Sequence, residues 1–412
     1  MNILEFGAVR GEMSTEAIQK AIDTAHAQGG GRVVVPAGEY LTAGIVLRSN
    51  VELHLEAGST LRFTDDFDAY PVINTRWEGY EQDSYRPLVY AKDCENIALT
   101  GFGTLEGQGK KWWTEFRAKR MTIARPCFVC FEDCNRVRME GFRVMNSPAW
   151  TIHPLRCENV TVHGLTVINP ADSPNTDGIN PESCRNVRIS DCHIDVGDDC
   201  IAIKAGTEDA VNQVPCENIT VTGCTMVHGH GGVVLGSEMS GSIRRVSITG
   251  CVFDGTDRGI RIKTRRGRGG SVEDVSVTGI VMNDVLCPLV VNLMYFCGKG
   301  GKDPIVSDRT AQPVTEATPH VRRIRMADIV VTNAKSAAAC LCGLPEAPLE
   351  DISIVNTQIQ LVESEPTVPV MNAVAEAVTC AGLTAEYVRG LHLTDVRITG
   401  AKGEEITLHE VQ

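Results

Sequence analysis

The chain has 412 residues, of which 43% are hydrophobic and 22% charged, so it can bury a large core and is not a disordered chain. Its formal net charge of -13 disfavours nucleic acid and anionic membrane surfaces as partners, and no apolar run is long enough to span a bilayer. The aromatic content of 5% and the 39 glycines suit many short strands separated by tight turns.

Residues 1–50 are expected to form an N-terminal cap and the first strands. A helix is predicted to begin after Ser14, a candidate N-cap, and to end at Gly29–Gly31. Its apolar stripe consists of Ala17, Ile18, Ala21, Ile22 and Ala25. We expect this helix to cover the open end of a solenoid. The N-terminus lacks the basic start and apolar stretch of a signal peptide.

A short phrase then recurs along the chain, with a polar turn followed by alternating apolar and polar residues. Examples are Cys94-Glu-Asn-Ile-Ala-Leu, Cys157-Glu-Asn-Val-Thr-Val, Cys216-Glu-Asn-Ile-Thr-Val, Val272-Glu-Asp-Val-Ser-Val and Leu349-Glu-Asp-Ile-Ser-Ile. Alternation predicts strands with one buried face, and most spacings fit one coil of a parallel β-helix. We therefore predict an all-β fold: one domain, residues 1–412, forming a single-stranded right-handed parallel β-helix with an N-terminal capping α-helix.

The repeats also indicate a role for most of the 16 cysteines. Cysteine opens the early phrases, in the slot that Ile243, Val272 and Val321 occupy later, so we expect most cysteines to be reduced core residues. A reducing compartment follows, and we expect a cytoplasmic location. The pairs Cys127/Cys130 and Cys340/Cys342 are isolated in apolar strands, which disfavours a zinc site.

Three segments interrupt the repeats, at about residues 66–86, 114–124 and 286–318. They are rich in Trp, Tyr, Gly and Pro. Loops inserted into a solenoid tend to lie on one face. We expect these loops to shape a cleft, with 286–318 near it.

Charged residues gather in four stretches that should lie on consecutive coils. They are Asn175-Thr-Asp177, Gly197-Asp198-Asp199, Gly229-His230-Gly231 and Arg261-Ile-Lys263. Asp177 and Asp199 are 22 residues apart, one plain coil, and neighbouring coils stack about 4.8 Å apart. The four stretches should therefore share one outer face.

Two consequences follow for the acids. Strict alternation would point Asp198 and Asp199 to opposite sides, so if both serve one site the backbone must leave the strand there, which Gly197 permits. Clustered carboxylates repel, so at least one should have a raised pKa, as glycoside hydrolysis requires of its acid. The basic run from Arg258 to Arg268 is either a pocket for an acidic sugar or a solvated basic face.

In this order, the four stretches resemble the motifs of glycoside hydrolase family 28, the polygalacturonase family of pectin-degrading enzymes. The similarity extends from about Leu4 to Tyr295 and includes Asn146-Ser-Pro-Ala-Trp-Thr-Ile-His153-Pro. The resemblance implies inverting hydrolysis of α-1,4-galacturonosyl bonds in pectic oligosaccharides, without a metal or cofactor. Asp198 would be the general acid, while Asp177 and Asp199 would hold and deprotonate the attacking water.

The resemblance also implies roles for other residues. His230 would tune the acid or contact the substrate, and Arg261 and Lys263 would bind the galacturonate carboxylate. Tyr295 is the candidate for a tyrosine that contacts substrate; His153 and Asn175 complete the substrate-binding set. The sequence around Gly229–Gly241 resembles exo-acting members, so we expect release of terminal galacturonic acid.

Three alternatives stay open at this point. The substrate could be rhamnogalacturonan or xylogalacturonan, the protein could be a calcium-dependent β-helical pectate lyase, or it could bind glycans without catalysis. The oligomeric state is also open, a homo-oligomer included.

Overall fold

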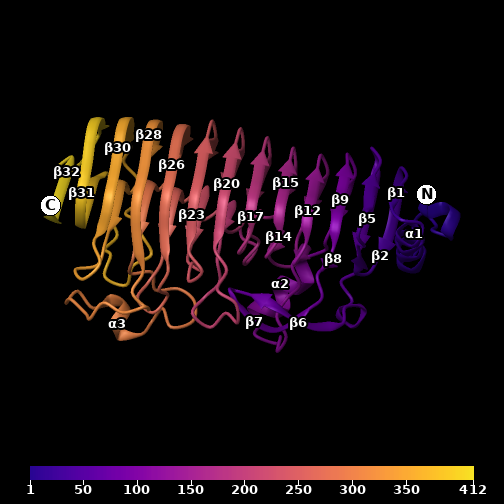
Figure 1. Cartoon of the computed structure of the whole chain (residues 1–412). Coiled ribbons are helices and arrows are strands. Elements are labelled where there is room, and N and C mark those ends of the chain that lie inside the picture. Colours follow the sequence, from indigo (N-terminus) through magenta and orange to yellow (C-terminus); the bar gives the residue numbers. More distant parts are fainter. The chain divides into compact units, whose positions relative to one another are not determined.

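The computed structural model describes residues 1–412, which form two compact units, Met1–Asp198 and Asp199–Gln412. In each unit, short strands stack in parallel, coil upon coil, as a right-handed parallel β-helix (Figure 1). The predicted fold class is confirmed, while the single-domain organisation stays a prediction. None of its helices combines the length and the apolarity needed to cross a lipid bilayer.

The first unit contains three parallel ladders. The first comprises β1 (Gly31–Val35), β4 (Val51–Leu55), β9 (Glu95–Gly101), β12 (Asn135–Glu140), β15 (Glu158–His163) and β17 (Arg185–Ser190). The second comprises β2 (Gly38–Thr42), β5 (Ser59–Phe63), β10 (Thr104–Glu106), β13 (Arg143–Met145), β16 (Thr166–Ile168) and β18 (His193–Val196). The third comprises β3 (Ile45–Val46), β8 (Val89–Lys92), β11 (Val129–Glu132) and β14 (Ile152–Leu155).

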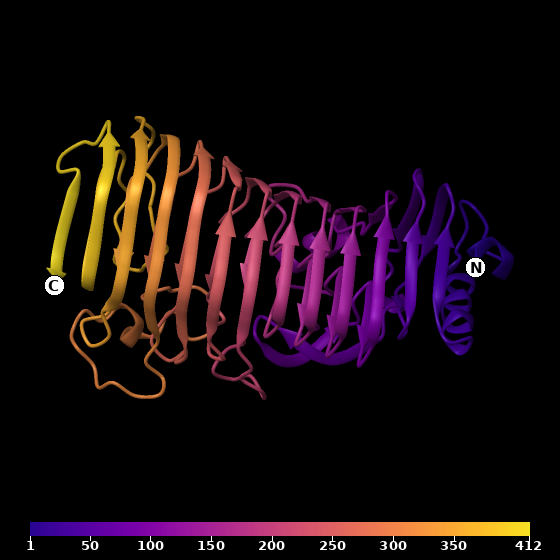
Figure 2. The ribbon, with the colours of Figure 1, turned by 45° about the horizontal axis from the view of Figure 1, so that its top comes forward.

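The second unit continues the same pattern with longer strands, as Figure 2 shows. One ladder comprises β20 (Cys216–Thr222), β23 (Ile243–Thr249), β26 (Ser271–Asn283), β28 (His320–Ala334), β30 (Leu349–Leu361) and β31 (Ala381–Thr399). Strands β21 (Thr225–His228) and β24 (Val252–Asp254) lead into the second half of β26. Another ladder comprises β19 (Ile201–Ile203), β22 (Val233–Gly236), β25 (Arg258–Lys263), β27 (Cys287–Asn292), β29 (Ala337–Cys342), the start of β31, and β32 (Ile406–Val411).

The recurring phrase explains both the core and the corners of each coil. Its apolar positions stack on one another inside the coil, as in the register Cys216–Ile243–Val272. All three side chains are fully buried, and the cysteines of the chain are free thiols, so their predicted core role is confirmed. The third residue of the phrase turns the chain: Asn96 and Asn159 have φ of 54° and 57°, a left-handed conformation that Asn tolerates.

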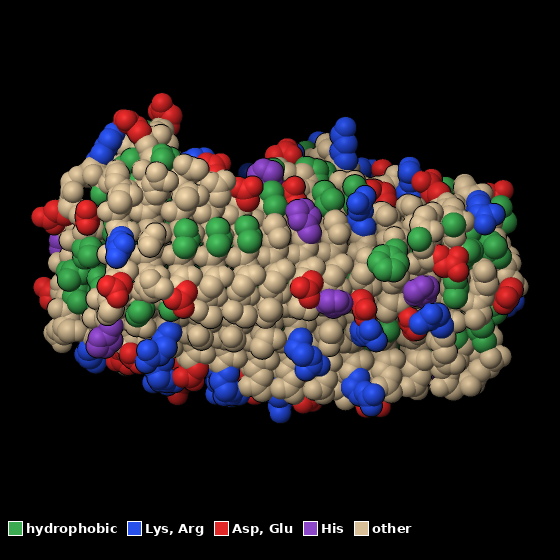
Figure 3. Space-filling view, turned by 90° about the horizontal axis from the view of Figure 1, so that it is seen from above, with side chains coloured by type: hydrophobic (Ala, Val, Ile, Leu, Met, Phe, Trp, Pro, Cys, Tyr) green, Lys and Arg blue, Asp and Glu red, His purple; other side chains and the backbone are tan.

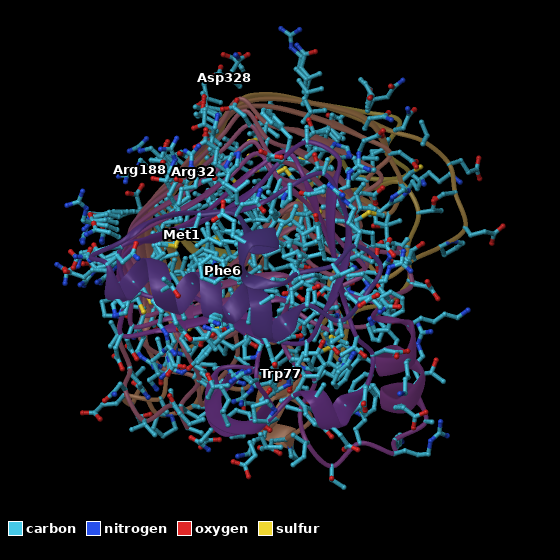
Figure 4. The ribbon with its side chains drawn as sticks, turned by 90° about the vertical axis from the view of Figure 1, so that its right-hand side faces the viewer. Met1, Phe6, Arg32, Trp77, Arg188 and Asp328 are labelled. Carbon is cyan, nitrogen blue, oxygen red and sulfur yellow. The ribbon has the colours of Figure 1, made fainter.

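The outer faces carry the alternate, polar positions. Figure 3 shows acidic and basic side chains mixed over the surface, with short rows of hydrophobic side chains among them. Val252, Val281 and Val330 stack in register and are each about half exposed, at 44%, 47% and 46%. In the first unit, Arg32 of β1 and Arg188 of β17 lie on the same side, away from Trp77 (Figure 4).

The predicted capping helix is α1 (Thr15–Ala27), which follows the short η1 (Ile3–Phe6) and packs against β1, β3 and β4. Its predicted apolar stripe is buried. Ser14 occupies the N-cap position but makes no side-chain capping bond, because its hydroxyl donates to carbonyl groups of Val9 and Glu12 instead. Ser14 therefore has the predicted N-cap position, but the prediction that its side chain caps the helix is wrong.

The insertions differ in part from prediction. Residues 66–86 contain η2 (Phe67–Ala69) and an antiparallel hairpin of β6 (Val72–Trp77) and β7 (Tyr80–Tyr85), and α2 (Lys110–Arg117) begins before residue 114. The boundary at residue 286 is wrong, because β27 pairs with β25 and β29 as part of the ladder. The loop proper follows β27 and contains α3 (Pro304–Ser307). A further loop, residues 362–380 between β30 and β31, was not predicted.

Candidate active site

In the first unit, Asp177 and Asp198 lie side by side although 21 residues separate them in the chain. Carboxylate oxygens of the two lie within 4.8 Å of one another. Asp177 lies between β16 and β17, is 3% exposed, and accepts a hydrogen bond from Asn180 Nδ2 at 3.1 Å. Asp198 follows β18 and is half-buried, so it is the more accessible acid of this pair.

The backbone leaves the regular strand between β18 and β19, as predicted for the two adjacent acids. Residues 197–200 belong to no strand. A Cβ on Gly197 would lie 2.5 Å from the carbonyl oxygen of Ser173 and 2.6 Å from that of Pro170. Only glycine fits this close approach of the bend to the loop that carries Asp177.

Arg125, which the sequence analysis missed, holds that loop from beneath. Its Nη1 donates to the carbonyls of Pro148 and Pro174 at 2.9 and 2.8 Å, and its Nη2 donates to Asn175 Oδ1 at 2.6 Å. Burial lowers the pKa of Arg125 to about 10, with Glu78 and Asp198 among the opposing charges, so it stays protonated at neutral pH. Asn175 has φ of 53°, and this bond occupies its side-chain oxygen.

His153 lies in the interior of the same unit. Its side chain is fully buried, and its Nε2 lies 2.9 Å from Glu182 Oε2. The ring packs edge-on against Trp150, and the fully buried Arg76 lies 3.7 Å from Glu182. His153 therefore cannot contact a substrate directly in this structure, which corrects the prediction. The histidine instead belongs to a buried network of charged groups.

In the second unit, Asp199 is buried between two cations. Lys263 Nζ donates to its Oδ2 at 2.6 Å and Arg261 Nη1 donates to its Oδ1 at 3.2 Å. Burial alone would raise the pKa of Asp199, but the charges of Lys263, Arg261 and Lys204 outweigh that effect and hold the pKa below its ordinary value. This carboxylate is ionised at neutral pH. A raised pKa, expected for at least one acid, is therefore not found at Asp199.

The stacking of coils brings these groups together. Arg261 and Lys263 alternate along β25, and in the parallel register they face Val234 and Gly236 of β22. Gly231 leaves room beside them, since a Cβ there would lie 3.2 Å from Asp199 Oδ1. Within this unit, Asp199 and the Gly229–Gly231 and Arg261–Lys263 stretches thus come together.

Tyr295 and His230 complete this group. The Tyr295 ring lies 5.6 Å from Arg261 Cζ and 5.2 Å from Lys263 Nζ, distances at which a ring attracts a cation. His230 is exposed, and its carbonyl oxygen accepts from Arg261 Nη1 at 3.4 Å.

The rest of the basic run is neither a solvated face nor a wide pocket. Its arginines are buried and clamp the surrounding loops. Arg265 and Arg268 both bind Glu208, and Arg266 binds Glu346. Arg258 binds backbone carbonyls of the 362–380 loop. The pattern of charges could not show this, because the partners lie up to 111 residues away.

A second buried pair, Lys204 and Glu238, was also missed. Their side-chain atoms are 3.0 Å apart. Burial opposes ionisation of Glu238, but Lys204, Arg268 and Lys263 lower its pKa to about 2. Lys204 also acts on Asp199, so this pair belongs to the same electrostatic network. Its sequence signal was the Gly236-Ser-Glu238 segment.

Comparison with known proteins agrees with this combination of fold and carboxylates. The chain matches the glycosyl hydrolases family 28 over residues 29–380 and belongs to that family. It is therefore a glycoside hydrolase of the polygalacturonase family, as the resemblance implied.

Individual relatives are similar over most of their length. A probable polygalacturonase of Vitis vinifera is 33% identical over 382 residues, covering 89% of this chain and 76% of that protein. An endo-polygalacturonase of Pectobacterium carotovorum subsp. carotovorum is 28% identical, covering 74% and 78%. The solved structure of a hyperthermoactive exopolygalacturonase from Thermotoga maritima has a TM-score of 0.80 and 32% identity, covering 98% of this chain and 92% of that chain.

Proposed function

We propose that this chain is an exo-acting polygalacturonase that releases terminal galacturonic acid from pectic oligosaccharides with inversion. The observation that carries the proposal is the pairing of Asp177 and Asp198 within 4.8 Å, with an ionised Asp199 directly following Asp198 in the chain. An acid and an ionised base beside each other are what glycosidic hydrolysis requires.

Asp198 is the proposed general acid. As the half-buried member, it reaches the glycosidic oxygen and gives up its proton as the bond from C1 to that oxygen breaks. A water molecule attacks C1, and Asp177 and Asp199 hold it and take its proton. Lys263 and Arg261 keep Asp199 ionised and fix its position, and the remaining lone pairs of its oxygens can still accept a hydrogen bond from the attacking water.

The substrate carboxylate would bind at Arg261 and Lys263. The planar guanidinium suits a carboxylate, and Tyr295 fixes both cations from one side. His230, with its exposed imidazole, would contact the sugar or tune the acid. Asn175 is proposed to hold its loop in place beside the substrate, because its side-chain oxygen already accepts a hydrogen bond from Arg125.

Two observations support exo action. The exopolygalacturonase from Thermotoga maritima is 32% identical over nearly the whole chain. In the first unit, the inserted 66–86 and 114–124 segments meet, where Tyr85 N donates to Ala124 O at 3.0 Å. They line a half-open pocket of about 190 Å³, with Trp77, Phe116 and Arg125 among its residues. A small pocket with two aromatic side chains in its wall suits the end of a sugar chain rather than its middle.

The spacing of the acids makes the stereochemistry a sharp test. Carboxylates in most inverting glycosidases are roughly 6.5–9.5 Å apart and in retaining ones roughly 5–5.5 Å. The distance here is shorter than the inverting range, so inversion rests on the buried, doubly paired Asp199 and on the family resemblance. Proton NMR of the first product decides: inversion of an α bond releases the β anomer, and initial α anomer would contradict it.

The test of the roles is Asp198→Asn assayed on tri-galacturonic acid. Loss of the acid should lower kcat by about 10² to 10⁴-fold while circular dichroism stays unchanged. Near-normal turnover would contradict the assignment. Wild-type enzyme should release monomer first from longer chains, whereas an early mixture of oligomers would contradict exo action.

The calcium-dependent lyase alternative has one observation in its favour, since oxygens of Asp177 and Asp198 are close enough to share a cation. Asp199, however, is already neutralised by Lys263 and Arg261. In the same assay, loss of activity with a chelator and products that absorb ultraviolet light would favour the lyase. A strong preference for rhamnogalacturonan or xylogalacturonan would favour those substrates instead.

A further inference from the structure

The 362–380 loop, which no sequence pattern indicated, is fixed onto the strands that carry Arg261 and Lys263. Arg258 Nε donates to Pro369 O at 3.1 Å and its Nη2 donates to Val368 O at 2.7 Å. Val370 is 4% exposed and packs with an apolar cluster that includes Cys287, Val290 and Cys340. The backbone of this segment is therefore held by both polar and apolar contacts.

The two residues that follow Val370 lie beside the strand residues of the cation site. Asn292 Nδ2 donates to Met371 O at 3.0 Å, and Asn372 forms a backbone bridge with Tyr295. Met371 Sδ lies 2.8 Å from Arg261 Nη2 and is its acceptor. The Met371 side chain is half-buried, so one side of it faces solvent.

The chemistry of this contact makes it replaceable. A thioether sulfur is a weak hydrogen-bond acceptor, whereas a carboxylate binds a guanidinium with charge-assisted bonds. Methionine has an unbranched, flexible side chain that can move without its backbone. A uronate carboxylate arriving at Arg261 would displace the sulfur, while the pinned backbone at 368–372 stays in place.

We propose that Met371 is a specificity-determining residue, which covers the Arg261 guanidinium and limits the sugar bound there to unsubstituted galacturonate. The inference rests on the proposed function, because it takes Arg261 as the carboxylate receptor. Since Arg258 and Asn292 hold the loop, it cannot recede from a bulky substituent. A galacturonate carrying a xylose branch then meets the Met371 side chain.

The experiment compares kcat/KM for tri-galacturonic acid and for a xylose-substituted galacturonate oligosaccharide. Met371→Ala removes three heavy atoms beyond Cβ and should raise the ratio of substituted to unsubstituted activity by about tenfold or more. Met371→Leu keeps a similar volume and should leave the ratio near that of the wild type. Val374→Ala is the matched control, because Val374 is exposed in the same loop.

The outcomes separate the two proposals. An unchanged ratio in Met371→Ala, with normal turnover of tri-galacturonic acid, overturns the role of Met371 and leaves the proposed function standing. An equal rise in Val374→Ala also overturns it, since general loosening of the loop would then suffice. If the wild type does not hydrolyse tri-galacturonic acid, the proposed function itself fails.

Discussion

The carboxylate of Asp199 stays charged although it is 1% exposed, because two cations bind its two oxygens. Such a buried group contributes to the structure only while both signs of charge are present. The same contacts hold Arg261 and Lys263 in fixed positions. Under the proposed function, stability and substrate recognition would depend on the same three side chains.

Removal of one cation should therefore be costly. We expect Lys263→Met to lower the free energy of unfolding at pH 7 by about 3–5 kcal/mol, measured by urea titration. The pKa of Asp199 is lowered in the folded state, so its ion pairing stabilises the fold above the ordinary carboxyl pKa of about 4 and is lost as the pH falls through the lower, folded-state value. The difference between wild type and variant should accordingly shrink below pH about 4.

The matched control for that variant is Lys335→Met. Lys335 pairs with Asp284 at 2.5 Å, but both side chains are partly exposed, at 32% and 47%. Its removal should cost less than about 1 kcal/mol. If both variants lose a similar free energy of unfolding, the argument that the buried ion pair contributes more than the exposed one is contradicted.

His153 shows what residue-level reasoning cannot supply. The motif that contains His153 predicted substrate binding. The residues next to it in the chain do not indicate that its side chain is buried. The packing of β14 against β11, the edge-on contact with Trp150 and the contact with Glu182 enclose the ring. Arg125 is the opposite case, an apparently ordinary arginine that supports the Asp177 loop.

At the scale of the elements, the third residue of each phrase governs the corner of the coil. Asn159 has φ of 57°, and its Nδ2 donates to Asn135 Oδ1 at 3.0 Å. Its own side-chain oxygen accepts from Asn186 Nδ2 at 3.2 Å. Asparagine thus serves twice, by tolerating the left-handed backbone and by bonding to the coils on either side.

Substitution of Asn159 separates these two contributions. Asn159→Gly keeps the backbone conformation and loses the bonds, so we expect a loss of about 1 kcal/mol. Asn159→Ala adds backbone strain and should cost about 1–2 kcal/mol more than the glycine variant. Urea unfolding midpoints give the order, and an alanine variant as stable as the glycine variant would contradict the argument.

The cysteine ladder also belongs to this scale. Cys94, Cys134, Cys157 and Cys184 open successive phrases and are all buried, in the slot that aliphatic residues fill in later coils. Their type and period predicted a core role, and the structure confirms it. The cytoplasmic location inferred from them stays a prediction.

For the molecule as a whole, the net charge of -13 opposes the approach of a polyanion, and under the proposed function Arg261 and Lys263 would attract it only at short range. Salt shortens the range of both effects, from about 30 Å at 0.01 M to about 10 Å at 0.1 M. Because exposed charges are screened before buried ones, the long-range repulsion should be lost first.

We therefore expect kcat/KM for oligogalacturonides to rise severalfold between these two salt concentrations, with kcat nearly constant. Steady-state kinetics at fixed pH check this expectation. A fall in kcat/KM over the same range would mean that attraction by the basic groups outweighs the net charge.

The amino-acid sequence alone determined the coils, the buried positions of the repeated phrase and the four charged stretches. Residues that recur at the length of one coil stack on one another, so the repeat period gives their placement directly. It also predicted a bend at Gly197 if both adjacent acids serve one site, since they cannot share one side of a regular strand. The tertiary structure alone decided the partners of the basic run, the burial of His153 and the position of Met371 over Arg261. Those features depend on contacts between loops and strands far apart in the chain, for which no period exists.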